Sequence, residues 1–235
     1  MPTTTHRRAA PVENLLATVL LATSVGCTSF ATVRSAVVAP GLSANLQSSI
    51  AANPGDLAGW SWDIDCTQKC GHAMPSTDLG FAMGQRPRGA MPYAVSVGLS
   101  GTYPYADGYV QLRDAASFPA GIGARVAPPL QGWYEAQLYG RMDIPLSDRT
   151  RLLWNPGLFY HGGHSPNHQS TGSFRAMVQS IGFQFDVGHV SITPSSSIVF
   201  GRAARTSDGQ VYQPETRAFL TAEIGVTRRQ AASRH

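Results

Sequence analysis

The sequence predicts an all-β protein that folds as a single antiparallel up-and-down β-barrel of 8 to 10 strands. Three observations support this prediction: polar and apolar residues alternate over many segments, turn-forming residues separate these segments, and no helical stretch lies between them. The composition agrees, because 24 glycines, 16 prolines and only 14% charged residues suit strands and turns better than a helical bundle. At 235 residues the chain has room for one such domain behind a leader.

Residues 1–26 have the layout of a bacterial export signal, with a basic stretch at Arg7 and Arg8 and an apolar run over 15–22 that is too short to span a bilayer. The small residues before Cys27 resemble the lipobox of bacterial lipoproteins. The resemblance implies that 1–26 is a lipoprotein-type signal peptide and that Cys27 carries the lipid, with palmitate among its acyl chains. Thr28 and Ser29 lack the retention aspartate of that family, which implies the outer membrane. An ordinary signal peptide with an incidental Cys27 is the alternative.

The predicted domain plan follows from this leader. We expect 27–56 to be an anchor and linker, 57–228 to be the β-barrel domain and 229–235 to be a basic tail. A weak alternation at Leu42, Ala44, Leu46 and Ile50 leaves open a first strand inside the linker.

The remaining cysteines, Cys66 and Cys70, are predicted to form a disulfide. With Cys27 assigned to lipid they are left as a pair, and an oxidising periplasm favours closing the small loop between them. A zinc site made of Cys66, Cys70 and His72 is the alternative, although no fourth ligand is evident nearby.

The clearest element is a hairpin over 132–160 with its turn at Pro145-Leu146-Ser147-Asp148. A strand signal at 60–64 and a shorter one at 79–84 precede it. From Tyr93 onward the alternation is regular and gives eight strands. These strands are 93–100, 109–113, 122–127, 133–144, 152–160, 174–187, 190–202 and 217–227.

Connection lengths indicate which face of the barrel lies inside. The joins at 145–148 and 188–189 are short, whereas those at 161–172 and 203–214 are long. Short turns at one end and long loops at the other are typical of outer-membrane barrels. We therefore predict a membrane-type barrel with a polar lumen and periplasmic termini. The predicted lumen-facing charges are Glu135, Arg141, Asp143, Arg217 and Glu223. A periplasmic lipocalin-like barrel, with the apolar face inside, is the alternative.

The pattern from about Gly41 to Arg228 resembles small bacterial outer-membrane β-barrels. This resemblance implies a location in the bacterial outer membrane and a fold. It does not imply an activity.

The segment 161–170 carries three histidines beside serines. In the outer-membrane lipid A deacylases, a His-x-Ser pair supplies the base and the nucleophile, and His168-Gln169-Ser170 is similar in spacing. No glutamate follows at a comparable distance to orient the histidine. His161, His164 and His168 are also candidate ligands for a transition metal. The third interpretation is a polar surface loop.

The leading functional hypothesis is a non-enzymatic outer-membrane β-barrel lipoprotein with a structural or surface-interaction role. The alternatives are a lipid A acyl hydrolase that uses the 161–170 segment and a periplasmic lipocalin-like carrier of an apolar ligand. We expect outer-membrane lipid as the surrounding partner, a monomer, no cofactor, and no nucleic acid, because a scattered net charge of +4 is too mild. Any envelope protein partner stays unidentified.

Overall fold

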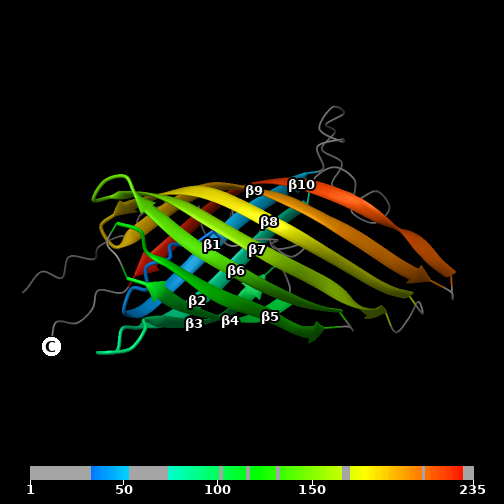
Figure 1. The fold of residues 1–235 in the computed structure, drawn as a ribbon, viewed down its shortest axis with the longest axis horizontal. Coiled ribbons are helices and arrows are strands. Elements are labelled where there is room, and N and C mark those ends of the chain that lie inside the picture. Colours follow the sequence, from blue (N-terminus) through cyan, green and yellow to red (C-terminus); the bar gives the residue numbers. More distant parts are fainter. Residues whose placement is uncertain are drawn as a thin grey trace, which may run out of the picture.

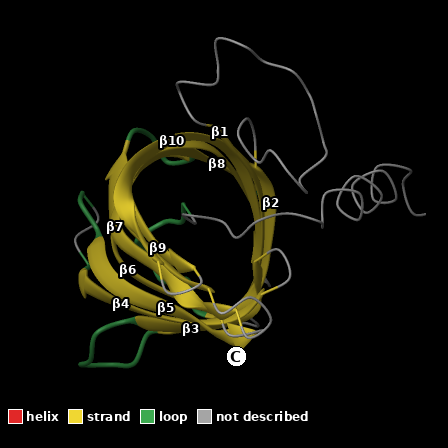
Figure 2. Cartoon of the chain, turned by 90° about the vertical axis from the view of Figure 1, so that its right-hand side faces the viewer, coloured by secondary structure: helices red, strands yellow, loops and turns green. Residues whose placement is uncertain are grey.

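The computed structural model describes residues 33–52, 74–100, 103–114, 117–130, 133–165, 170–207 and 210–229. These residues form one closed antiparallel barrel in which every strand pairs with its neighbours in the sequence (Figures 1 and 2). The strands are β1 (Gly41–Ala52), β2 (Met74–Gln85), β3 (Tyr93–Ser100), β4 (Tyr103–Arg113), β5 (Ala120–Leu130), β6 (Trp133–Pro145), β7 (Thr150–Ser165), β8 (Ser170–Val187), β9 (Val190–Ser207) and β10 (Gln210–Arg229). The predicted fold is confirmed, with ten strands.

The barrel closes between its first and last strands. β1 pairs with β10 from Ser43 opposite Arg229 to Ala52 opposite Leu220, so the described sheet has no free edge. β1 lies inside the range 27–56, so the barrel begins before residue 57. Its alternation is weak in the sequence because Ala44 and Ser48 interrupt the apolar outward row, and the inward residues Asn45, Gln47 and Ser49 carry no charge. The strand signal at 60–64 lies outside the described residues.

The two ends of the barrel differ. At the end where β1 begins and β10 stops, the β6–β7 and β8–β9 connections are tight, whereas those at 86–92 and 114–119 are longer. Gly188 in the β8–β9 turn has a φ of 63°, a conformation that glycine adopts without strain. At the other end, the rim, β7 to β10 are 16 to 20 residues long and reach farther than β3, which has 8 (Figure 1).

The prediction of long loops at 161–172 and 203–214 is therefore wrong, because most of these residues belong to paired strands. β7 and β8 stay paired as far as Ser165 opposite Ser170, and β9 and β10 as far as Ser207 opposite Gln210. These strands carry Gly, Ser and Thr toward the rim, a composition that is also typical of loops. A backbone ladder needs no apolar face, so pairing continues where the alternation of the sequence stops.

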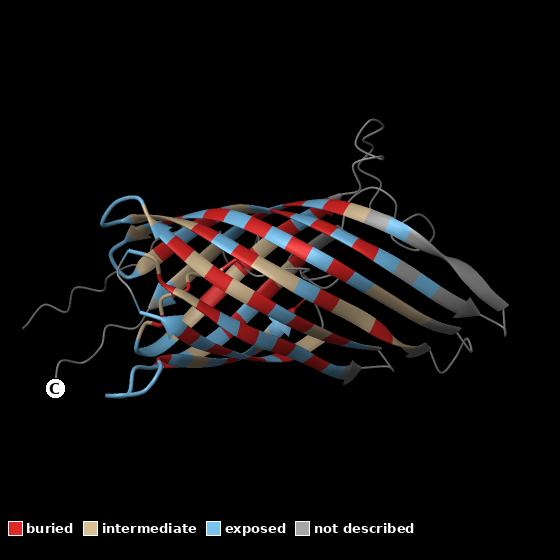
Figure 3. Ribbon diagram, viewed as in Figure 1, coloured by how far each residue is buried: buried red, intermediate tan, exposed pale blue. Residues whose placement is uncertain are grey.

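Burial is inverted relative to a soluble barrel. Buried and exposed positions alternate along the strands (Figure 3). Leu138 and Ile144 on β6 are 56% and 43% exposed, whereas Glu135 and Arg141 on the same strand are 7% and 5% exposed. The lipocalin-like alternative requires an apolar interior and an outward polar face, so this burial contradicts it.

The outward apolar positions form a belt. On β8 it runs from Met177 to Val187, a rise of roughly 33 Å along the strand. At a tilt of about 40° this corresponds to about 25 Å along the barrel axis, the height of the apolar band of membrane barrels. The polar residue in this run, Gln179, accepts a hydrogen bond from Trp154 Nε1 at 3.0 Å. Within the described ranges there is no helix of the length and apolar character needed to cross a bilayer.

Candidate functional site: a lumen closed by the chain itself

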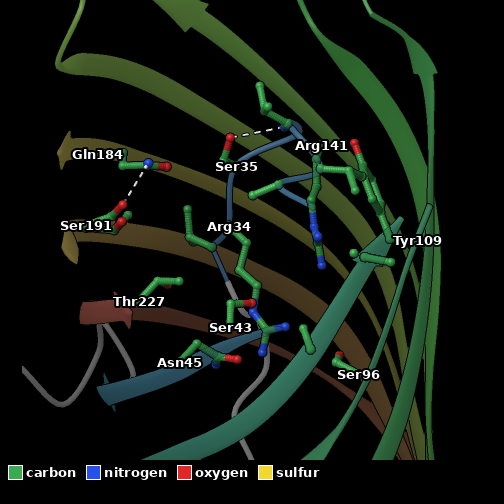
Figure 4. Close-up of a pocket in the computed structure, with 18 of the residues that line it drawn as sticks. Arg34, Ser35, Ser43, Asn45, Ser96, Tyr109, Arg141, Gln184, Ser191 and Thr227 are labelled. Carbon is green, nitrogen blue, oxygen red and sulfur yellow. Dashed lines mark hydrogen bonds between the residues drawn. The ribbon is translucent and has the colours of Figure 1, made fainter. Parts of the chain in front are cut away.

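Residues 33–40, which we name the plug segment, lie inside the barrel and lead directly into β1. Val33, Ala36 and Val38 are 4%, 0% and 4% exposed. Figure 4 shows Arg34 and Ser35 between Arg141 and Tyr109 on one side of the lumen and Gln184 and Ser191 on the other. The sequence analysis assigned these residues to a linker and did not predict their place in the lumen.

Side chains of the barrel wall satisfy the backbone of the plug segment. Asp143 Oδ1 accepts from the N–H of Ala36 at 2.7 Å, and Gln111 Oε1 accepts from that of Val38 at 2.9 Å. Tyr109 Oη donates to the Ala36 carbonyl at 2.9 Å, and Asn155 Nδ2 donates to that of Arg34 at 3.0 Å. Ser35 Oγ also donates to Asp143. Buried backbone groups outside a sheet require such partners, so the wall is built to hold this segment.

Arg34 projects from the plug segment into a cluster of buried charges. Its guanidinium lies 3.6 Å from Asp78 Oδ1 and 3.8 Å from Asp107 Oδ2, and it donates to Tyr105 Oη at 3.1 Å. Burial disfavours the charged guanidinium, but Tyr105 and the two aspartates outweigh that effect and raise the pKa of Arg34. Arg34 therefore stays cationic and ties the plug segment to the wall.

Two wall arginines complete this cluster. Arg125 Nη1 lies 2.7 Å from Asp78 Oδ2, and Arg141 Nη2 lies 3.5 Å from Asp107 Oδ2. Both guanidiniums also stack on tyrosine rings: Arg125 Cζ is 3.6 Å from the Tyr105 ring centroid, and Arg141 Cζ is 4.4 Å from that of Tyr109. Each of these buried guanidiniums is therefore paired with a carboxylate, the condition under which buried charges persist.

The opposite wall, on β8 to β10, uses hydroxyl groups around one carboxylate. Glu223 accepts from Gln47 Nε2 and Thr221 Oγ1, each at 2.6 Å, and its Oε1 lies 2.8 Å from Ser197 Oγ. Ser197 Oγ also lies 2.8 Å from Ser180 Oγ. These residues are buried, and their polar groups are satisfied by one another.

Little free volume remains in the lumen. A cavity of about 90 Å³ lies between the plug segment and the wall, which is room for a few water molecules. Toward the rim, Phe159, Val178, Val199 and Phe219 form a buried apolar cluster against which Phe174 packs. In the part of the barrel that the structure describes, the interior is therefore filled by side chains and by the plug segment.

The structure places four of the five predicted lumen charges on the inner wall. Glu135, Arg141, Asp143 and Glu223 are all buried. Arg217 lies in β10 opposite Gly201, and its side chain is outside the described residues.

His161 is not in a loop. It lies in β7 directly opposite Glu135 in β6, and its Nδ1 is 3.0 Å from Glu135 Oε1. Glu135 lies upstream of the histidines in the sequence, whereas a glutamate was expected downstream of them. The signal that finds it is the register of the hairpin, in which Pro145 opposite Arg151 leads residue by residue to Glu135 opposite His161.

The other candidate residues lie outside the described side chains. His164 is in β7 opposite Thr171, and Ser170 opens β8, but only their backbones are described. His168 is not described, nor are Cys27, Cys66, Cys70 or the leader. Among the described residues no three His, Cys, Asp or Glu side chains gather as a metal site. The catalytic, metal, lipid and disulfide predictions therefore stay predictions.

Comparison with known proteins gives no family. No family model matches the chain, and no curated protein matches its sequence. Similar solved structures include Neisserial surface protein A (NspA), with a TM-score of 0.36, 10% identity, and coverage of 80% of this chain and 96% of that one. The KdgM porin in complex with disordered oligogalacturonate has a TM-score of 0.33 and 5% identity over 80% and 99% of the two chains. Similarities this distant say nothing about activity. Any inference about activity has to rest on the side chains of this chain.

Proposed function

We propose that this chain is a bacterial outer-membrane β-barrel lipoprotein, anchored through Cys27, with a structural or surface-interaction role. The observation that carries this proposal is the inverted burial of a closed barrel. Leu138 and Leu158 on neighbouring strands are each 56% exposed, while Asp78 and Asp143 inside are 0% exposed. Among the described residues, many large apolar side chains of the strands are exposed in this way; facing water they would promote aggregation, whereas a bilayer solvates them.

The filled lumen supports a structural or binding role over transport. The plug segment occupies the half near the tight turns, and the cluster around Phe159 and Phe219 occupies the rim half. About eight strands already enclose an interior that side chains fill, and this ten-stranded barrel also holds the plug segment. β1 begins and β10 stops at the same end of the barrel, which supports a periplasmic position for that end, as in other outer-membrane barrels.

The proposal is tested in cells that express the full chain. We expect the protein in the outer-membrane fraction, heat-modifiable migration on a gel, and radiolabelled palmitate incorporation that Cys27→Ser abolishes while Cys66→Ser does not. Protein that is soluble without detergent would overturn the membrane assignment. Palmitate labelling that survives in Cys27→Ser would overturn the anchor alone.

The same cells test the enzymatic alternative. Under the proposed role, the mass spectrum of lipid A is identical with and without the protein. A loss of acyl chains that Ser170→Ala prevents would replace the structural role with that of an acyl hydrolase.

A further inference from the structure

A groove of about 750 Å³ runs across the outer wall near the rim. Its floor is one row of side chains in register on four neighbouring strands: Leu138 is opposite Leu158, Leu158 is opposite Met177, and Met177 is opposite Phe200. These side chains are 56% to 57% exposed. The groove is therefore an apolar trough on the face that the proposed membrane covers.

Two arginines line the rim side of this trough, in the next row of outward-facing residues. Tyr160 is opposite Arg175, and Arg175 is opposite Arg202, so two exposed cations lie side by side on β8 and β9. Residues directly opposite on antiparallel strands have Cα atoms about 4.5–5.5 Å apart, and like charges in such pairs repel. A bound anion removes that repulsion.

No carboxylate among the described residues forms an ion pair with Arg175 or Arg202. The one partner of Arg175 that the structure gives is aromatic, with its Cζ 5.6 Å from the Tyr160 ring centroid. Tyr134 Oη donates to Tyr160 Oη at 3.2 Å, which fixes that ring at the end of the groove. Arg175 is thus positioned over the Tyr160 ring, and the exposed guanidiniums of Arg175 and Arg202 are open to a ligand.

The height of the pair on the barrel indicates the ligand. Arg175 lies one outward position above Met177, where the apolar belt of β8 begins, and the belt then continues down to Val187. Lipid phosphates lie directly above the hydrocarbon region, at the level of this pair. A second outer-wall groove of about 560 Å³, lined by residues such as Phe81, Val95 and Val97, has no cationic residue in its lining.

We infer that Arg175 and Arg202 bind the phosphate of an anionic membrane lipid whose acyl chain lies in the groove over Leu158, Met177 and Phe200. The two guanidiniums chelate one phosphate, Tyr160 positions Arg175, and the apolar row holds the chain beneath. This inference rests on the proposed membrane location. It adds a specific lipid site to a wall that would otherwise contact lipid without preference.

The test uses the full-length protein purified in detergent and native mass spectrometry with dioleoyl phosphatidic acid as the probe. Wild type is expected to retain phosphatidic acid in preference to dioleoyl phosphatidylcholine and to dioleoylglycerol, which lacks the phosphate. Arg175→Gln/Arg202→Gln should weaken phosphatidic acid binding by at least about tenfold, because charged hydrogen bonds are lost. The matched control is Arg228→Gln. Arg228 is an exposed arginine of β10 at the end of the barrel away from the rim, and it pairs with Ala44 and Val190. It should leave binding within about twofold.

Two further arms separate the outcomes. Inorganic phosphate at millimolar concentration should not displace the lipid, and Arg175→Lys/Arg202→Lys should restore part of the affinity because the charge is retained. Equal retention of phosphatidic acid by the glutamine variant, or displacement by inorganic phosphate, overturns the lipid site. A barrel that is heat-modifiable and membrane-inserted but shows no preference for phosphatidic acid overturns this inference and leaves the proposed function intact.

Discussion

The two halves of the inner wall satisfy buried polar groups in different ways. The half formed by β2 to β6 carries whole charges: Asp107 is shared by Arg34, Arg141 and the hydroxyl of Tyr139. The half formed by β8 to β10 carries mostly hydroxyls: Ser180 and Ser197 are linked to each other, and Ser197 also contacts Glu223. The charged half also contacts the plug segment through Arg34 and Asp143, so its pairing fixes both the wall and what fills the lumen.

This difference predicts unequal sensitivity to substitution. Removing one member of a buried charge network leaves the others without compensation, which costs about 3–5 kcal/mol. Removing one neutral hydroxyl from a network with other donors costs about 0.5–1.5 kcal/mol. We therefore expect substitutions in the charged half to cost more than those in the hydroxyl half.

Asp107→Ala should have the largest effect. Its side chain is 4% exposed, and its loss leaves Arg34 and Arg141 with fewer compensating charges. We expect a loss of about 3–5 kcal/mol in the free energy of unfolding, measured by urea titration of the protein in vesicles with tryptophan fluorescence and gel mobility as readouts. The control is Asp114→Ala, whose ion pair with Arg86 is exposed on both sides and should change stability by about 0–1 kcal/mol. Equal losses in the two variants would show that the buried charge network stabilises the barrel no more than an exposed ion pair does.

Ala36→Asp should release the plug segment from the lumen. Ala36 is fully buried and its N–H donates to Asp143, so a carboxylate at this position meets a like charge. Losing the backbone hydrogen bonds of the segment should lower the free energy of unfolding by about 2–4 kcal/mol. The same variant should raise single-channel conductance in planar bilayers above that of wild type. Pro40→Asp, at an exposed position of the same segment, is the control and should do neither. Wild-type conductance in folded Ala36→Asp would show that this segment does not close the lumen.

Gly123→Ala tests how closely the tyrosines of the charged half lie on the wall. A Cβ at position 123 would come within 2.4 Å of Tyr139 Cζ, whereas a Cβ at Gly108 on the neighbouring strand would meet nothing within 4 Å. Overpacking should lower the free energy of unfolding by about 1–3 kcal/mol in Gly123→Ala. Gly108→Ala should be neutral or stabilise by about 0.5–1 kcal/mol, because alanine loses less conformational freedom on folding. A neutral Gly123→Ala in the same urea titration would show that the Tyr139 ring moves freely.

The sequence predicted the parts of the fold in which chemistry alternates strongly, and it missed the parts in which it does not. On β6, Glu135 and Arg141 alternate with Leu138 and Ile144, so the sequence predicts both the strand and the face that points inward. On β1, Asn45 and Gln47 face inward without charge, and Ala44 and Ser48 interrupt the outward apolar row, so the strand resembles a linker.

The plug segment shows a different limit. The wall residues that bond its backbone are more than seventy residues away, as for Gln111 with Val38 and Asp143 with Ala36. No periodicity marks Val33 to Pro40, and what places these residues inside is the closure of the barrel around them. The contact between His161 and Glu135 was within reach of the sequence, because the turn at 145–148 fixes the register of that hairpin. The pairing of Arg175 with Arg202 could be read from the Gly188–His189 turn in the same way.

Ser197→Ala should have the smallest effect of the set, and it decides whether the two halves really differ. Ser197 is buried and contacts Ser180 and Glu223, but the Glu223 carboxylate keeps its bonds from Gln47 and Thr221. The free energy of unfolding should fall by about 0.5–1.5 kcal/mol in the urea titration used for Asp107→Ala. Thr216→Ala, at an exposed position on the outer face of β10, should change it by less than about 0.5 kcal/mol. A loss in Ser197→Ala as large as that in Asp107→Ala would mean that the hydroxyl half depends on each of its members as strongly as the charged half does. The contrast between the two walls would then fail.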